Sequence, residues 1–288
     1  MTIDLHIHSL ASDGKFSIQE IFKEAKNRGI TFLSITNHDN INGQTQAITE
    51  AKKTDIRYIS GVELNVTLSY QKYKNGQTFA LDFLGYQFNP NNQALQNKLA
   101  LLTHYRQKRA TKILQNINTE FKKENIPPLT KKDLQKITQT VEGTLGRPHI
   151  ADYLVNKKIV ANRQEAFDKY LIKCDVPKYP LHLEEAAKLI QDAGGKLVLA
   201  HPSDSCGTSL QPITQNIQEQ TRIIQENMLQ YIDGVECWHP SHTTKTTQHY
   251  IKFAKEHNLL MTGGSDCHQK PVIMGTIKVP SWTIDQFC

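Results

Sequence analysis

Short apolar runs alternate with helical periodicity at the start of the chain. Strands are expected over three segments in which apolar side chains cluster: residues 4–8, 32–36 and 57–63. After the first of these, apolar residues recur at three- and four-residue steps: Ile18, Ile21, Phe22 and Ala25. This spacing predicts an amphipathic helix, and Ser17 with Glu20 has the pattern of a capping box at its start. A second helix is expected near residues 43–53. A strand–helix repeat of this kind predicts an α/β barrel or a doubly wound sheet.

The pattern changes in the middle of the chain and then returns. A hairpin is expected around Asn75-Gly76. Beyond residue 91 the apolar positions follow helical spacing: Leu95, Leu99, Leu102, Ile113, Ile117 and Phe121. Strands return later, over residues 196–200, 233–237 and 259–263. We therefore expect an α/β body that carries the chemistry and an inserted helical cap domain: residues 1–90 with 181–288, and residues 91–180.

Positive charge is concentrated in the predicted helical insertion. The whole chain has 34 Lys and Arg against 28 Asp and Glu, a net charge of +6. Residues 98–136 hold ten Lys or Arg and three Asp or Glu, so this stretch sums to +7 and the rest of the chain to −1. Such a charge run is common on a solvated helix face, and it also guides anionic nucleotides or short single strands. Only Tyr105 and Phe121 are aromatic there, which favours small or short substrates over long polymers.

Composition narrows the class of protein. No apolar run is long enough for a transmembrane helix, and the first predicted strand begins too early to leave room for a signal peptide. The cysteines form no C-x-x-C pair: Cys174, Cys206, Cys237, Cys267 and Cys288. Unpaired cysteines of this kind favour reduced thiols in a cytosol. We expect a cytoplasmic protein with no membrane partner, and no segment indicates an obligate protein partner.

Ionisable residues gather at the ends of the predicted strands. In the segment that begins at Asp4, alternation places His6 and His8 on one face, where both imidazoles can reach one metal ion. Asp4 lies on the same face and is expected to orient an imidazole or to serve as a ligand. Candidate ligands recur at strand ends along the chain: His6, His8, Asp13, His38, Glu63, Asp82, His201, Asp266 and His268. One ion needs three or four protein ligands, so this set suggests two or three ions, and mixed imidazole and carboxylate ligation suits zinc, manganese or iron.

These segments resemble the motifs of the polymerase and histidinol phosphatase (PHP) family. The motifs are Asp4-Leu-His6-Ile-His8-Ser with Ser12-Asp13-Gly14, Thr36-Asn-His38-Asp39, Gly61-Val-Glu63, Ala200-His201-Pro202 and Gly264-Ser-Asp266-Cys-His268. Two further segments resemble the branch that includes nucleoside 3′,5′-bisphosphate phosphatases and 5′→3′ exoribonucleases: Gly146-Arg147-Pro148-His149 and Gly234-Val-Glu-Cys-Trp-His-Pro-Ser-His242. The resemblance implies a distorted (β/α)7 barrel with three divalent metal ions and an inserted helical domain over its mouth.

The resemblance also implies a role for each ligand. The first ion takes His6, His8, Glu63 and Asp266; the second takes Glu63 as a bridge, His201 and the residue at position 82; the third takes Asp13, His38 and His268. The chain departs from the family at two positions, where Asp82 replaces the usual histidine and Asn37 the usual aspartate. Asp82 adds a hard oxygen donor, which favours manganese or iron over zinc. Asn37 is expected to alter only the surroundings of His38.

Phosphate chemistry fits such a centre. Divalent ions attract an anionic phosphoester, acidify bound water toward neutrality and stabilise charge on the transferred phosphoryl group. Arg147 stands at a predicted helix start, where a guanidinium and backbone N–H groups suit a phosphate. We expect Arg147, His149 and His242 to bind substrate and His242 and Asp266 to be catalytic. The expected activity is metal-dependent hydrolysis of a nucleoside 3′,5′-bisphosphate or of the 5′ end of short RNA.

Two other functions fit parts of the same pattern. One is a phosphomonoesterase for a small metabolite such as histidinol phosphate. The other is a non-catalytic nucleic-acid-binding module with a decayed metal site, for which Asp82 and Asn37 are the only support. The segments at Arg147 and Trp238–His242 favour the nucleotide phosphoesterase. Metal content and turnover of an aryl phosphate ester separate an enzyme from a binding module.

Overall fold

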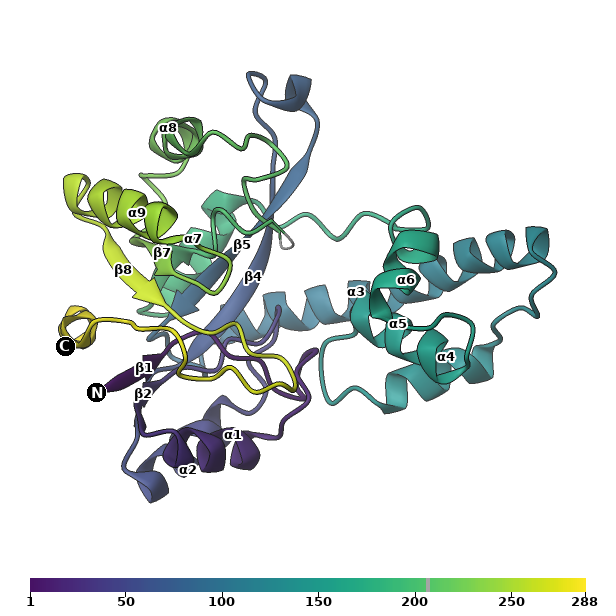
Figure 1. Cartoon of the computed structure of the whole chain (residues 1–288), viewed down its shortest axis with the longest axis horizontal. Coiled ribbons are helices and arrows are strands. Elements are labelled where there is room, and N and C mark those ends of the chain that lie inside the picture. The colour runs from purple at the N-terminus through teal and green to yellow at the C-terminus, as the bar shows by residue number, and fades with distance from the viewer. Residues whose placement is uncertain (206–207) are drawn as a thin grey trace.

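The computed structural model describes residues 1–205 and 208–288, which form two β-sheets with flanking helices and a further group of helices beside them (Figure 1). The first sheet is parallel, with its strands in the order β1 (Thr2–Asp4), β2 (Ile30–Leu33) and β3 (Arg57–Tyr58). Helices α1 (Ile18–Asn27) and α2 (Gln44–Thr54) connect these strands, as parallel pairing requires. The predicted capping box at Ser17 and Glu20 is present, and the apolar face of α1 is buried.

Within the described residues, the second sheet has five strands in the order β4-β5-β6-β7-β8. Their bounds are β4 (Gly61–Leu68), β5 (Phe79–Tyr86), β6 (Lys196–Leu199), β7 (Gly234–Trp238) and β8 (Leu260–Gly263). β4 and β5 form the predicted antiparallel hairpin, whose turn contains η1 (Lys74–Gly76), and β6, β7 and β8 run parallel. The helical elements of this part are α7 (Leu183–Asp192), α8 (Ile217–Asn227), α9 (Thr244–Glu256) and η3 (Ser281–Phe287).

The segment 5–8 lies between the two sheets. The regular strand β1 ends before it, because these residues bond to both sheets: Leu5 N donates to Gly263 O at 3.2 Å, and Thr36 N donates to Ile7 O at 2.8 Å. Single bridges also join Ile7 to Cys267 and His38 to Glu63. Across the described residues no continuous ladder closes the two sheets, so the structure shows a mixed α/β fold and no closed barrel.

The single strand predicted over residues 57–63 divides between the sheets as β3 and β4. Ile59 N still donates to Leu33 O of the first sheet at 3.2 Å. A Cβ at Gly61 would lie 2.2 Å from the Ser34 hydroxyl oxygen, so this close approach requires glycine. The chain therefore changes sheet at this glycine, and the sequence pattern alone does not show the change.

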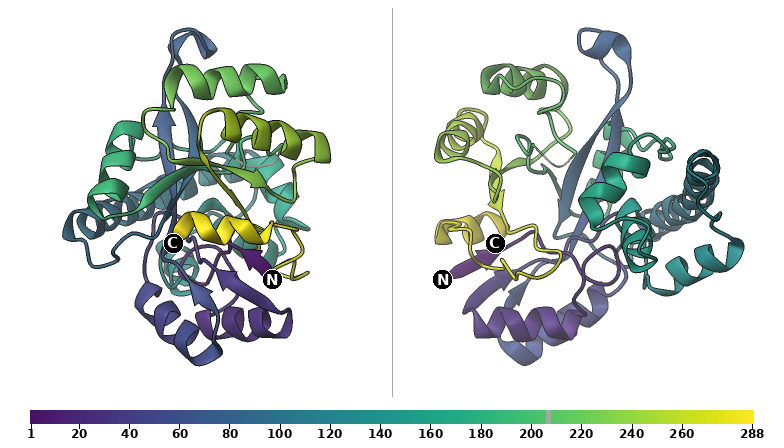
Figure 2. Two further views of the ribbon diagram at one scale, coloured as in Figure 1. Left: turned by 90° about the vertical axis from the view of Figure 1, so that its left-hand side faces the viewer. Right: turned by 45° about the vertical axis from the view of Figure 1, so that its right-hand side comes forward.

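A group of helices lies beside the sheets, on the right in Figure 1 and in the right-hand view of Figure 2. It contains α3 (Gln93–Lys123), α4 (Lys131–Gln139), α5 (Arg147–Asn156), α6 (Arg163–Ala166) and the π-helix η2 (Phe167–Leu171). The start of α3 packs into the core of the second sheet through Leu95, Leu99 and Leu102, whereas Ile113 and Ile117 pack among the other helices of the group. The long helix predicted from apolar spacing thus spans two separate cores.

Two expectations from composition can be compared with the structure. No helix in the described ranges is long and apolar enough to cross a membrane. Cys174, Cys237, Cys267 and Cys288 are free thiols, and Cys206, which was also expected to be reduced, lies outside the described residues.

Candidate metal centre

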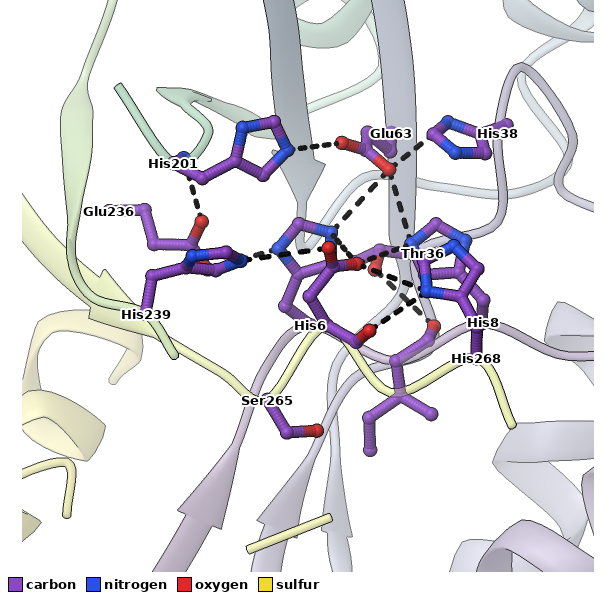
Figure 3. Close-up of polar contacts among 12 residues, drawn as sticks. His6, His8, Thr36, His38, Glu63, His201, Glu236, His239, Ser265 and His268 are labelled. Atoms are coloured by element: carbon purple, nitrogen blue, oxygen red, sulfur yellow. Dashed lines mark hydrogen bonds and ion pairs between the residues drawn. The ribbon is translucent and has the colours of Figure 1, made fainter. Parts of the chain in front are cut away.

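Every ligand expected from the sequence lies in one region, where the two sheets meet. Figure 3 shows His6, His8, His38, Glu63, His201 and His268 of this set. In the described part of the chain these residues form three overlapping groups, numbered here in order: His6, His8, Glu63 and Asp266; Glu63, Asp82 and His201; His8, Asp13, His38 and His268. Within each group the donor atoms lie within 4.8 Å of one another. His8 and Glu63 each belong to two groups, so the three groups are contiguous.

The first group has the geometry of a metal site. His6 Nε2 lies 3.4 Å from Glu63 Oε2 and 3.2 Å from Asp266 Oδ1, and His8 Nε2 lies 3.2 and 3.1 Å from the same two oxygens. Four donors bound tetrahedrally at about 2.0–2.2 Å are separated by about 3.3–3.6 Å. All four atoms are buried, and none has a hydrogen-bond partner among the described residues. Since a buried unpaired polar atom costs about 1–3 kcal/mol, a cation among these donors removes a large penalty.

The second group is as buried as the first, whereas Asp13, His38 and His268 of the third are partly exposed. Asp13 Oδ1 lies 3.4 Å from His268 Nε2, and Asp13 Oδ2 lies 3.8 Å from His38 Nε2. His201 Nε2 lies 3.0 Å from Glu63 Oε1, the oxygen that does not face the first group. Glu63 is therefore placed to bridge two sites with its two oxygens.

Asp82, which replaces the usual histidine, is held by its neighbour across the hairpin. Asn65 is paired with Asp82 between β4 and β5, and its Nδ2 donates to Asp82 Oδ1 at 2.5 Å. Burial and the charge of Glu63 raise the pKa of Asp82. A cation near these two carboxylates favours their ionised forms, which is the state that ligates.

The electrostatic balance of the centre also indicates a cation site. Although burial lowers the pKa of an imidazole, Glu63 raises the pKa of His201 to about 9, and Asp13 with Asp266 raises that of His268 to about 10. The negative charge of the buried carboxylates is therefore stabilised by positive charge placed beside them. Divalent ions supply that charge and leave the imidazoles neutral, the form that binds metals.

A cavity of about 360 Å³ opens over these groups, and cations line its other side. They are Arg106 and Arg109 of α3, Arg147 at the start of α5, and Lys178 on the segment that follows η2. A larger cavity of about 740 Å³ adjoins it and shares several of these residues. The basic stretch recognised in the sequence therefore does supply side chains that face the metal centre.

Comparison with known proteins agrees with this geometry. Residues 4–184 match the PHP domain. The chain belongs to the PHP domain family. A 5′-3′ exoribonuclease of Haemophilus influenzae is 28% identical over 274 residues, which cover 92% of this chain and 89% of the relative. A 3′,5′-nucleoside bisphosphate phosphatase of Chromobacterium violaceum is 27% identical over 281 residues, which cover 92% and 87%.

A solved structure supports the fold of this PHP domain protein. A Bifidobacterium adolescentis protein described as a metal-dependent phosphoesterase superposes with a TM-score of 0.80 at 24% identity. The superposition covers 99% of this chain and 94% of the other. The two chains therefore share their fold over nearly their whole length.

The site also contains a buried carboxylate, Glu236, that the sequence did not indicate as a site residue. His6 Nδ1 donates to Glu236 Oε1 at 3.0 Å, and the backbone N–H of His201 donates to Oε2 at 2.8 Å. Because the carboxylate only accepts, it fixes the proton of His6 on Nδ1 and leaves Nε2 for a metal. The only signal in the sequence was an acidic residue inside a short apolar strand, β7.

Asp4 has a different role from the two that were expected. It contacts backbone groups and, among the described residues, no imidazole ring. The backbone N–H groups of Ser265 and Gly275 donate to its two oxygens, each at 2.8 Å. Burial raises the pKa of Asp4 to about 6. Asp4 therefore fixes the loop that carries Asp266 and is not itself a ligand.

Asn37 and His149 hold the turn that carries Asp13. Asn37 Oδ1 accepts from Ser9 N at 2.8 Å and from Ser12 Oγ at 2.9 Å. His149, expected to bind substrate, uses both ring nitrogens inside the protein: Gly146 N donates to Nδ1 and Nε2 donates to Ser12 O, each at 3.0 Å. His149 therefore has no free nitrogen for a substrate, and its geometry is that of a positioning residue.

His242 lies one side chain away from the centre, and His239 takes the nearer place. His242 Nδ1 lies 3.0 Å from Cys237 O, and its ring stacks on Tyr250 with 5.8 Å between centroids. Burial lowers the pKa of His242 to about 4, which favours the neutral imidazole over the imidazolium. His239 Nε2 instead lies 3.6 Å from Asp266 Oδ2 (Figure 3). The sequence does not distinguish these two histidines.

Proposed function

We propose that this protein is a metal-dependent phosphoesterase that hydrolyses phosphate esters of nucleotides. The observation that carries the proposal is the contact between three overlapping ligand groups and a cavity lined by cations. The ligands suit divalent ions, and the cations suit the negative charge of a phosphate. The relatives named as an exoribonuclease and a nucleoside bisphosphate phosphatase support nucleotides as the substrate class. The substrate is a nucleoside 3′,5′-bisphosphate or the 5′ end of short RNA.

The centre holds three divalent ions, one in each ligand group, with manganese, iron or zinc as the metal. Glu63 bridges the first two groups, and His8 stands between the first and the third. Bound ions of this kind supply acidified water and stabilise the charge of a transferred phosphoryl group. The chain itself contributes the orientation: Glu236 fixes His6, and Asp4 fixes the loop of Asp266.

The architecture proposed for this activity has two parts. Residues 1–90 and 181–288 form a distorted (β/α)7 barrel that carries the metals, and residues 91–180 form a helical cap. The separate apolar core of the cap helices supports this division. So do Arg106 and Arg109, which reach from α3 into the lining of the cavity.

Arg147 binds a phosphate of the substrate that is not hydrolysed. It lies at the N-terminus of α5 and lines both cavities. Its Nη1 donates to Asp175 Oδ2 at 2.8 Å, and a guanidinium has five N–H donors, so donors remain for a phosphate.

A phosphate-release screen over nucleotides, with metal analysis of the same sample, tests this function. The expected result is bound divalent metal and turnover of a nucleoside 3′,5′-bisphosphate or a short 5′-phosphorylated RNA. His8→Ala and Asp266→Ala are expected to fold and to lose turnover, whereas His104→Ala, on the exposed face of α3, keeps it. A near-normal rate in either ligand variant, after metal removal and controlled reconstitution, contradicts the mechanism.

The same screen separates the competing functions. Turnover of histidinol phosphate without turnover of nucleotides indicates a metabolite phosphatase. Absence of turnover with every ester, including an aryl phosphate, indicates a binding module.

A further inference from the structure

The cavity over the metal centre and the larger cavity beside it meet at one boundary. The residues that line both are Arg109, Arg147, Lys178 and Thr208. Lys178 lies on residues 172–182, which lead from the cap helices back to α7 (Figure 1). A substrate too large for the smaller cavity extends past this boundary, so the residues there decide what lies next to the reacting phosphate.

Most of the arginine charge that lines the smaller cavity is already compensated within the protein. Arg106 forms a buried ion pair with Asp39, whose Oδ2 accepts from Arg106 Nε at 2.9 Å. Arg109 and Arg147 share a single carboxylate, Asp175, one on each oxygen. These three arginines and two carboxylates sum to one net positive charge.

Lys178 differs from the three arginines. It is half-buried, lines both cavities, and forms no ion pair or hydrogen bond with the described residues. The two residues outside the described ranges, Cys206 and Gly207, carry no carboxylate. Burial disfavours the charged ammonium of Lys178, and Asp82 and Asp39 offset that cost only from a distance. An anionic ligand in contact with the ammonium removes the remainder.

We infer that Lys178 is a specificity-determining residue that binds the substrate phosphate that is not hydrolysed. The inference rests on the proposed function, in which the metals bind the reacting phosphate. An ammonium group offers three N–H donors and a full charge, and it complements the directional hydrogen bonds of Arg147. The adjoining cavity of about 740 Å³ is large enough for the remainder of a nucleotide. Substrates with two phosphates are therefore preferred over simple monoesters.

Steady-state kinetics of Lys178→Ala on two substrates tests the assignment. For adenosine 3′,5′-bisphosphate, we expect kcat/KM to fall about tenfold to a hundredfold, the effect of one charge-assisted hydrogen bond, with most of the loss in KM. For p-nitrophenyl phosphate, which has no second phosphate, we expect little change. Lys178→Arg is expected to restore most of the loss. Lys173→Ala is the matched control, because Lys173 lies on the same segment but pairs with Glu120 and lines neither cavity.

Product inhibition gives a second readout that does not depend on turnover of the bisphosphate. Inhibition by the mononucleotide product is expected to weaken in Lys178→Ala by the same factor as kcat/KM, whereas inhibition by orthophosphate is unchanged. Thermal unfolding checks that the variant folds. Equal losses on both substrates, or unchanged inhibition by the mononucleotide, overturn the role of Lys178. They leave the proposed function standing, because turnover of nucleotides by the wild-type protein in the phosphate-release screen tests that function independently.

Discussion

Replacing Glu236 with glutamine tests whether residues behind the metal ligands set metal affinity. Glu236 accepts a hydrogen bond on each oxygen, from His6 Nδ1 at 3.0 Å and from His201 N at 2.8 Å. Glutamine keeps one accepting oxygen and replaces the other with an NH₂ donor. If the NH₂ faces His6, it forces the imidazole proton onto Nε2, the nitrogen that faces the first ligand group. If it faces the backbone N–H of His201, two donors oppose each other. Either orientation disturbs one ligand.

The size of the effect follows from the burial of the site. Glu236 is 0% exposed, so water cannot replace the lost acceptor. A buried unpaired donor costs about 1–3 kcal/mol. Loss of such an outer partner usually lowers metal affinity about 10- to 100-fold. Since a tenfold change in affinity corresponds to about 1.4 kcal/mol, the two ranges agree. We expect Glu236→Gln to bind the ion about 10- to 100-fold more weakly.

Competition with a chromogenic chelator measures this change directly. Glu184→Gln is the matched control, because Glu184 is exposed in the first turn of α7, away from the centre. Circular dichroism and thermal unfolding of the metal-free proteins check that both variants fold. Unchanged metal affinity in a folded Glu236→Gln variant would refute the assigned role.

Three further predictions concern substrate, metal and stability. Arg147→Ala is expected to lose roughly ten- to a hundredfold in kcat/KM for a nucleoside 3′,5′-bisphosphate and little for an aryl phosphate; equal losses would place Arg147 on the reacting phosphate or in folding. Asp82→His is expected to remain active and to shift metal preference toward zinc, which reconstitution and metal analysis measure. If Asp82→Ala has the metal content and rate of the wild type, Asp82 is not a ligand. Asp133 accepts from the Tyr153 hydroxyl at 2.6 Å and from the Lys157 ammonium at 2.8 Å, and although burial opposes it, these partners hold the pKa of Asp133 well below its usual value. Asp133→Asn should therefore lower unfolding free energy by about 1.5–3 kcal/mol at pH 7. Because the pKa of Asp133 is depressed in the folded state, its contribution to stability is present above the unfolded pKa of about 3.9 and is lost as pH falls below it. Denaturation from pH 7 down to pH 3 should therefore show a shrinking difference in unfolding free energy between the wild type and Asp133→Asn. A difference that stays constant with pH would contradict the argument.

Local sequence pattern is sufficient to predict an element that depends on contacts between near neighbours in the chain or on a single apolar face. The capping box of α1 and the apolar stripe of α3 are both present where the spacing predicts them. The pattern fails where a segment must choose a partner strand. Residues 57–63 have the pattern of one extended segment, yet the chain changes sheet at Gly61, because β3 pairs with β2 and β4 pairs with β5. Alternation indicates that a segment is extended and does not indicate what it pairs with.

The same distinction holds within the site. The candidate ligands can be recognised in the sequence because imidazoles and carboxylates recur at the ends of predicted strands. The resemblance to PHP family motifs then implies which of them share an ion. The residues that orient these ligands have no distinctive sequence pattern, and their role is seen only from their contacts in the structure. Glu236 contacts His6 across 230 positions of sequence, and His149 contacts Ser12 across 137. No local pattern records a contact of that range, so a role in substrate binding was expected for His149 and none for Glu236.

Contacts from α3 and α5 and contacts from the two sheets hold different ligand groups of the proposed metal centre. Arg106 of α3 donates to Asp39, the residue that follows His38 in the chain. His149 of α5 donates to Ser12, the residue that precedes Asp13. His38 and Asp13 both belong to the third ligand group. The third ligand group is thus shaped by contacts from both cap helices. The first group is shaped by Glu236 and by the segment between the sheets, which belong to the body. A displacement of α3 or α5 therefore acts most directly on the third group, and it can reach the first group through the shared ligand His8. Asp39 also accepts from the backbone N–H of Asn65, whose side chain holds Asp82, so contacts of substrate with α3 are coupled to the second group as well.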